Sequence, residues 1–194
     1  MILAGGEGRR FGGPKAFARL PDGRVFLEAC SAVLADAGAR PVAATLPPCC
    51  TADGVAWLRP LPLPERGLDM LGSLRWGLRH LISEPEWTAV IMLPVDHPLV
   101  SRDSIVALAE VDAPVVIPTF AGKHGHPIRL NREVAETIAR EKIGGATVRE
   151  VLGAIGGVDV AVDDPGVVAN CNTPDALREA INIVNSEFQI RNFE

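Results

Sequence analysis

The sequence lacks several features that would assign it at once to a class of protein. Its longest apolar runs stop well short of the roughly 18 residues that a membrane-spanning helix needs. The apolar start MILA passes directly into glycines and arginines, unlike a signal peptide. The four cysteines contain no CxxC pair, so neither a disulfide framework nor a zinc site is expected. We therefore expect a cytoplasmic protein with reduced thiols and no membrane partner.

Positive charge is also scarce. Nineteen lysines and arginines stand against 24 acidic residues, a formal net charge of -5. A nucleic-acid partner would require a clustered basic face, so none is expected. The length of 194 residues and the 47% apolar content fit a single domain, which we place at residues 1–185, followed by an irregular tail at 186–194.

Apolar periodicity predicts that strands and helices alternate. Helices are expected at 26–37, 70–82, 101–108, 133–140, 147–152 and from 173 onward. Strands are expected at 41–45, 55–58, 89–93, 115–117, 158–162 and 167–169, while the prolines within 59–66 predict an extended connection. This order predicts a three-layer α/β/α Rossmann-like fold with a mostly parallel mixed sheet. Ligands of such sheets bind at the carboxyl ends of the strands.

The segment from Leu3 to Lys15, LAGGEGRRFGGPK, carries five glycines and three basic residues directly after the first apolar residues. Ordering so many glycines costs backbone entropy, and a polyphosphate that needs close backbone N–H groups would compensate for it. The segment is not a Walker A loop, since no GK[ST] closes it, and it does not fit the dinucleotide pattern GxGxxG. The alternative is a loop that merely required turns.

The same segment resembles the signature LAxGxSxRMGxPK of the nucleotidyltransferases that make molybdenum-cofactor dinucleotides, and more broadly of sugar-nucleotide pyrophosphorylases. The resemblance implies backbone contacts to the nucleotide from Leu3, Ala4, Gly5, Gly6 and Gly8. It implies that Arg10 and Lys15 are catalytic cations on the triphosphate. Gly8 replaces the serine of the signature, which removes a hydroxyl that would contact a phosphate, and Phe11 replaces its methionine.

A second stretch, LPVDHP, places Asp96 at the end of an almost wholly apolar run. A carboxylate at the end of a buried strand, facing a polyphosphate, is suited to bind Mg²⁺. The alternative is that Asp96 caps the following turn, a common role beside proline. The resemblance implies that Asp96 is the catalytic, metal-binding aspartate of a D-x-P motif, with His97 in its variable position.

A third stretch, NCNTPDAL, resembles the D-x-D-T-P-E-D-L motif of the cytidylyltransferase-like branch and, more closely, the N-x-N-T-P variant of the guanylyltransferase branch. The resemblance implies that Asn172, or less directly Asn170, completes the Mg²⁺ shell through its carboxamide oxygen. The alternative is a helix start at Thr173-Pro174 with asparagines that stabilise the preceding turn.

Two further stretches match the same family in the same order. RGLDMLGSLRWGL resembles its G-x-x-x-S-L-x-x-G-L element, which implies that Gly72 and Ser73 lie beside the nucleotide, although an ordinary helix start explains the spacing equally well. GHPIRL resembles the GHP-[IV] feature of the cytidylyltransferase-like branch, which implies that His126 borders the ligand pocket. Arg129 stands where that branch has an apolar residue, and we expect it to influence the acceptor pocket.

Together these matches imply a Mg²⁺-dependent nucleotidyltransferase that moves a nucleoside monophosphate from CTP or GTP to a phosphorylated acceptor such as molybdopterin, releasing pyrophosphate. The base is left open, because GHP and N-x-N-T-P indicate different branches. Two alternatives also stay open. One is transfer to a sugar phosphate or another small metabolite. The other is a nucleotide-binding protein without turnover, for which Gly8, Asn170 and Asn172 are the reason.

Overall fold

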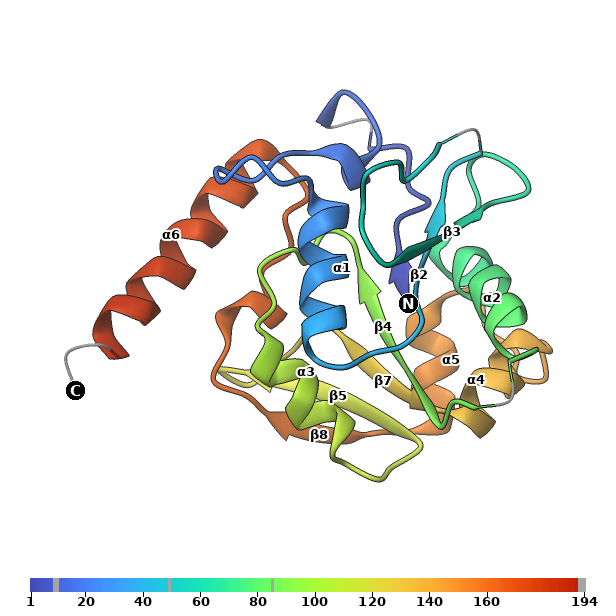
Figure 1. Cartoon of the computed structure of the whole chain (residues 1–194). Helices are drawn as coiled ribbons and strands as arrows, with labels where there is room; N and C mark the ends of the chain where they lie inside the picture. Colours follow the sequence, from blue (N-terminus) through green and yellow to red (C-terminus); the bar gives the residue numbers. More distant parts are fainter. Residues whose placement is uncertain (9–10, 49, 85, 192–194) are drawn as a thin grey trace.

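The chain folds around one mixed sheet. A computed structural model describes residues 1–8, 11–48, 50–84 and 86–191. In this part of the chain the sheet has the strand order β3-β2-β1-β4-β7-β5-β6, with β8 paired to β5 (Figure 1). The strands are β1 (Ile2–Leu3), β2 (Val42–Leu46), β3 (Leu58–Pro62), β4 (Ala89–Pro94), β5 (Val115–Phe120), β6 (Lys123–His124), β7 (Ile128–Asn131) and β8 (Val158–Ala161).

The part of the sheet formed by β1, β2, β3 and β4 is parallel. β1 runs parallel to both β2 and β4, and β2 runs parallel to β3. β7 then runs antiparallel to β4 and to β5, while β8 is parallel to β5. Strand β4 is therefore central, as its apolar sequence predicts, but it is parallel to its neighbour on one side only.

Helices cover both faces of this sheet (Figure 1). One face packs against α2 (Met70–Leu81), α4 (Arg132–Ala139) and α5 (Val148–Ile155). The other packs against α1 (Phe26–Asp36), α3 (Arg102–Ala109) and the start of α6 (Pro174–Arg191), whose far end projects away from the body in Figure 1. The predicted three-layer α/β/α fold is confirmed. None of the described helices combines the length and apolar character that crossing a bilayer requires.

The two cores follow from the alternation of side chains along each strand. In β4, Val90 and Met92 lie in the core beneath α2 and α4, whereas Leu93 lies in the core beneath α1. Strand β1 divides in the same way, with Leu3 on the first face and Ile2 on the second. Because both faces are buried, these strands are apolar at nearly every position, which is why their sequences show no alternation.

Side-chain caps decide where several helices begin. The side chain of Asp69 accepts a hydrogen bond from the N–H of Gly72 at 2.6 Å, and Ser101, Asn131 and Thr147 cap α3, α4 and α5 in the same manner. The predicted start of the last helix is also observed, since Thr173 Oγ1 accepts from the N–H of Ala176 at 3.1 Å and Pro174 is the first helical residue.

Four local predictions are wrong. Of the strand predicted at 55–58 only residue 58 is in a strand, because residues 56 and 57 form a turn. The proline-rich connection after residue 58 is strand β3, which tolerates Pro60 and Pro62 because it forms the edge of the sheet. The strand predicted at 167–169 is instead the end of a short 3-10 helix, Pro165–Val167. Helix α6 continues to Arg191, past residue 186 where the irregular tail was expected to begin.

Candidate active site

The glycine-rich segment leaves the carboxyl end of β1 and forms a tight loop. The N–H of Ala4, which was expected to contact the nucleotide, donates to Thr45 O of β2 at 3.1 Å and is therefore already bonded within the sheet. Farther along, the N–H groups of Phe11 and Gly13 both donate to the carbonyl of Gly8, at 2.8 and 3.4 Å. The loop then enters a short 3-10 turn that begins at Lys15. Arg10, the other predicted cation, lies outside the described residues.

The glycines of the loop have different reasons to be glycine. A Cβ on Gly5 would lie 2.3 Å from a methyl carbon of Leu63, and a Cβ on Gly8 would lie 1.9 Å from the carbonyl oxygen of Gly13. Gly8 also has a φ of +58°, in the left-handed region. A Cβ on Gly6, in contrast, would meet no atom within 4 Å. Gly6 is therefore the glycine of these three whose surroundings leave room for a ligand.

Lys15 joins the two residues that were predicted to bind the metal. Its Nζ atom donates to Asp96 Oδ2 at 3.0 Å and to Asn172 Oδ1. Asp96 follows β4 and Asn172 precedes α6, so the three side chains come from segments far apart in the sequence. Lys15 and Asp96 are largely buried, with 21% and 14% of their side-chain surfaces exposed. The tertiary structure thus gathers Lys15, Asp96 and Asn172 at the carboxyl edge of the sheet.

The segment that carries Asn172 is held against Asp96 by the backbone as well. The N–H of Cys171 donates to the carbonyl oxygen of Asp96 at 2.8 Å, and the N–H of Asn172 donates to Asn170 O at 3.0 Å. The side chain of Asn172 therefore faces Asp96 because the main chain of its neighbour is bonded there. Sequence reasoning missed this role of Cys171, since a backbone contact leaves no signal in residue type.

A cavity opens beside this cluster, between the loop and the start of α2. It is lined by Leu3, Gly5, Gly6, Lys15, Leu68, Met70, Ser73, Pro94, Val95 and Asp96. Ser73 is 4% exposed and lies near Gly5, and its predicted contact with the nucleotide stays a prediction. Gly72 does not line this cavity, and its N–H is already bonded to Asp69. The sequence analysis missed Leu68 and Met70, whose apolar side chains flank the Asp69 cap that a helix-start signal could have identified.

Asp96 and Asn172 form a donor set that suits magnesium. Both present hard oxygen atoms, and both reach one cation, the Lys15 ammonium, which shows that their positions converge. Among the described residues, no group of three or more histidine, cysteine or acidic side chains is arranged to hold a metal. A magnesium ion here would therefore take its other ligands from water and from phosphate oxygens, as it commonly does.

Two histidines, His97 and His126, lie close enough to Asp96 for its charge to affect the pKa of each. The rings of His97 and His126 contact each other edge to face, with centroids 4.9 Å apart. Each has a buried Nδ1 atom with no hydrogen-bond partner in the described part of the chain. Burial, with a contribution from His97, lowers the pKa of His126 to about 4, and burial also lowers the pKa of His97. Both imidazoles are therefore neutral at pH 7.

The GHP motif has a packing reason of its own. A Cβ on Gly125 would lie 2.3 Å from the carbonyl oxygen of Val167, and the N–H of His126 donates to that oxygen at 2.8 Å. Gly125 is thus required by the close approach of two main chains. His126 packs against His97, and residues 125–127 do not line the cavity beside Lys15.

The histidine pair predicts a loss of stability in mild acid. Because the pKa of His126 is about 4 in the folded chain and about 6.5 when unfolded, unfolding takes up a proton between these values and becomes more favourable as the pH falls. His126 contributes at most about 3 kcal/mol to this loss. Urea denaturation at pH 7.5, 6 and 5 measures it. His126→Gln, which cannot titrate, should show a smaller slope with pH, and equal slopes would contradict the prediction.

Cys171 and Cys30, whose pKa values the charge of Asp96 affects, are not nucleophiles. Burial, followed by the nearby charge of Asp96, raises the pKa of the Cys171 thiol to about 12, and the same causes raise the pKa of Cys30. Both thiols are therefore protonated at neutral pH, and the reactive thiolate is absent. The chemistry available to this cluster is charge neutralisation and positioning.

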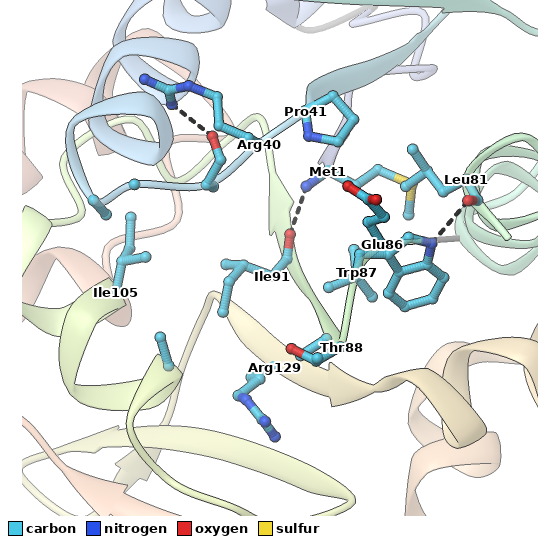
Figure 2. A pocket seen from close by; sticks show the side chains of 16 residues that line it. Met1, Arg40, Pro41, Leu81, Glu86, Trp87, Thr88, Ile91, Ile105 and Arg129 are labelled. Atoms are coloured by element: carbon cyan, nitrogen blue, oxygen red, sulfur yellow. Dashed lines mark hydrogen bonds between the residues drawn. The ribbon is translucent and has the colours of Figure 1, made fainter. Parts of the chain in front are cut away.

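A second cavity lies at the opposite end of the strands, where β1 and β4 begin (Figure 2). In it the amino group of Met1 donates to Ile91 O at 2.7 Å, and Trp87 and Arg129 contribute to the wall. The guanidinium of Arg129 donates to Ala113 O at 2.7 Å. The side chain of Arg129 is therefore used by the fold where β1 and β4 begin, and its expected influence on the acceptor pocket stays a prediction.

Known proteins resemble this chain in sequence and in fold. Residues 1–159 match the family model described as the MobA-like NTP transferase domain. A curated protein from Mycolicibacterium paratuberculosis, described as a probable molybdenum cofactor guanylyltransferase, is 28% identical over 192 residues, which covers 92% of each chain.

Solved structures share the fold. Rv0371c from Mycobacterium tuberculosis superimposes with a TM-score of 0.75 at 24% identity, over 93% of this chain and 96% of that one. Molybdopterin-guanine dinucleotide biosynthesis protein A from Archaeoglobus fulgidus superimposes with a TM-score of 0.63 at 19% identity, over 95% of this chain and 97% of that one. At these identities the likeness concerns the fold.

Proposed function

This chain belongs to the MobA-like NTP transferase domain family, and we propose that it transfers GMP from GTP to the phosphate of molybdopterin with release of pyrophosphate. The observation that carries the proposal is the convergence of Lys15, Asp96 and Asn172 beside the open backbone at Gly6. A pair of oxygens that bind a cation, an ammonium group and open space next to a glycine suit the phosphates of a nucleoside triphosphate.

Two observations favour GTP over CTP as the donor. The curated relative from M. paratuberculosis is described as a probable molybdenum cofactor guanylyltransferase, and the segment from Asn170 to Pro174 has the N-x-N-T-P form of that branch. The opposing marker, GHP at 125–127, does not line the cavity beside Lys15, and its Gly125 is required by packing against Val167. It therefore gives no independent support for cytosine.

The proposed reaction asks little covalent chemistry of the protein. An oxygen of the acceptor phosphate attacks the α-phosphorus of GTP in line, and the bond from that phosphorus to the bridging oxygen of pyrophosphate breaks. Asp96 and Asn172 would hold Mg²⁺, which when bound neutralises the charge on the phosphate oxygens. The backbone around Gly6 positions the triphosphate, and the ammonium of Lys15 stabilises negative charge on it. Arg10 stays a predicted phosphate ligand.

Pyrophosphate release tests this proposal. GTP, CTP, ATP and UTP are each supplied with Mg²⁺, with and without molybdopterin, and the rates are compared with those of Asp96→Ala to exclude contaminating enzymes. We expect release that needs both GTP and molybdopterin, with a kcat/KM for GTP about 100-fold above that for CTP. A preference for CTP would overturn the choice of base.

The alternatives from the sequence predict different outcomes of the same assay. Release of pyrophosphate with a sugar phosphate but not with molybdopterin would identify another acceptor. Measurable nucleotide binding without release under any condition would favour a binding protein, a reading motivated by the uncharged Asn172 in place of a carboxylate.

A further inference from the structure

The position of Lys15 differs from the one that its expected role requires. A lysine that binds a triphosphate should point toward open space, yet the Lys15 ammonium is bonded to Asp96 and Asn172. Those are the two side chains that we propose as metal ligands. Its main chain is fixed by the 3-10 turn, in which Ala18 N–H donates to Lys15 O at 3.0 Å, so only the flexible side chain can change this arrangement.

Charge balance at this cluster opposes the binding of a metal alone. Asp96 supplies one negative charge, Asn172 supplies none, and the Lys15 ammonium cancels the charge of Asp96. Within the described ranges no group of three or more histidine, cysteine or acidic side chains is arranged to hold a metal. A divalent ion that binds the same two oxygens would compete with the ammonium for them, and the two like charges would repel each other.

We propose that the Lys15 ammonium occupies the place of the metal in the free protein, so that metal binding and the release of Lys15 to the nucleotide are one exchange. This inference rests on the proposed function, in which Asp96 and Asn172 bind Mg²⁺ and Lys15 binds the triphosphate. The phosphates of an incoming nucleotide offer the ammonium new partners, and the cavity that Lys15 lines gives its side chain room to move toward them. Asp96 and Asn172 then become available to the ion.

The exchange has a thermodynamic consequence. Because Lys15 competes with the metal but assists the nucleotide, the metal and the nucleotide should strengthen each other's binding, by the same factor in both directions. Until the nucleotide arrives, the ammonium keeps the aspartate and the asparagine paired and in position. The site is thereby kept ordered in the absence of either ligand.

The binding of Mn²⁺ without nucleotide tests the proposal. Titration calorimetry and the electron paramagnetic resonance signal of free Mn²⁺ give the affinity for the full chain and for Lys15→Met. We expect Lys15→Met to bind Mn²⁺ about tenfold more tightly, because the competing cation is gone, and to bind GTP about tenfold more weakly. An equal or weaker affinity of Lys15→Met for Mn²⁺ would overturn the proposal, as would undetectable binding to that variant.

Two further variants guard the interpretation. Arg66→Met removes a positive charge from the wall of a neighbouring cavity, and it should leave the affinity for Mn²⁺ within about twofold of the wild type. An equal gain in Arg66→Met would mean that net charge alone acts, and the proposal would fall. Lys15→Gln retains a donor for Asp96 without the charge, and should also bind Mn²⁺ more tightly than the wild type. If Lys15→Met folds poorly, the affinity of Lys15→Gln for Mn²⁺ is measured in its place.

Thermal denaturation supplies a second readout. Mn²⁺ should raise the melting temperature of Lys15→Met more than that of the wild type, since the ion replaces the lost ammonium. If the affinities follow this order but no nucleotide releases pyrophosphate, the exchange stands and the proposed transfer fails. If pyrophosphate is released but Lys15→Met binds Mn²⁺ no more tightly, only the exchange fails.

Discussion

Replacing Asp96 with alanine is expected to lower kcat by about 1,000-fold while the protein keeps its fold. The side chain of Asp96 supplies the negative charge of the Lys15 cluster, and the remaining donor, Asn172, is uncharged. The architecture around it does not depend on the carboxylate, because the main-chain carbonyl of Asp96 still accepts the hydrogen bond from Cys171. Steady-state pyrophosphate release measures the loss, and circular dichroism measures the fold.

The control for this variant is Asp112→Ala. Asp112 is an exposed acidic residue in the connection between α3 and β5, away from the carboxyl edge of the sheet. Its replacement should leave kcat within about twofold of the wild type. If Asp96→Ala kept an activity and a Mg²⁺ dependence like those of the wild type, the assignment of the site would be wrong.

Replacing Gly8 with serine, which restores the residue of the family signature, is expected to lower kcat/KM by about 100-fold. The reason is the shape of the loop: a Cβ at this position would lie 1.9 Å from Gly13 O and 2.7 Å from the backbone nitrogen of Lys15. The φ of +58° adds a cost of about 1–2 kcal/mol for a residue with a side chain. The loop would therefore shift, and Lys15 would shift with it.

Binding and turnover of GTP measure the effect of Gly8→Ser. Gly13→Ala is the matched control for the fold, because Gly13 lies in the same loop, has no positive φ, and has open space where a Cβ would be added. Its melting temperature should equal that of the wild type. A Gly8→Ser protein with wild-type or higher kcat/KM would show that the missing hydroxyl matters more than the loop geometry.

The sequence alone predicted the layered α/β architecture and most of its elements. Helix α2 was predicted at 70–82 and is observed at Met70–Leu81, because its apolar face repeats with a helical period. Strand β4 was equally clear, since five apolar residues in succession fit a strand that is buried on both faces. Asp96 follows at the carboxyl end of that strand for the same local reason. A helical period or an uninterrupted apolar run, each read over a few residues, suffices for such predictions.

The errors arose where tertiary position overrides local propensity. Pro60 and Pro62 disfavour a strand in general, but β3 is at the edge of the sheet, where a missing N–H leaves no partner unsatisfied. Val167 is apolar enough for a strand, yet it ends a short 3-10 helix. Its carbonyl oxygen accepts a hydrogen bond from the N–H of His126. No local pattern distinguishes an edge strand from a loop, or a buried turn from a strand.

By itself, then, the sequence determined the family resemblance and the class of fold, and it predicted the residues that would carry the chemistry. Only the tertiary structure decided how those residues are paired. It placed the Lys15 ammonium on Asp96 and Asn172, the latter 157 positions away along the chain, and set His126 against His97 behind them. It also showed that Gly8 is required by its own loop. The physical reason is that contacts between distant segments depend on the packing of the whole sheet, which the local order of residues does not specify.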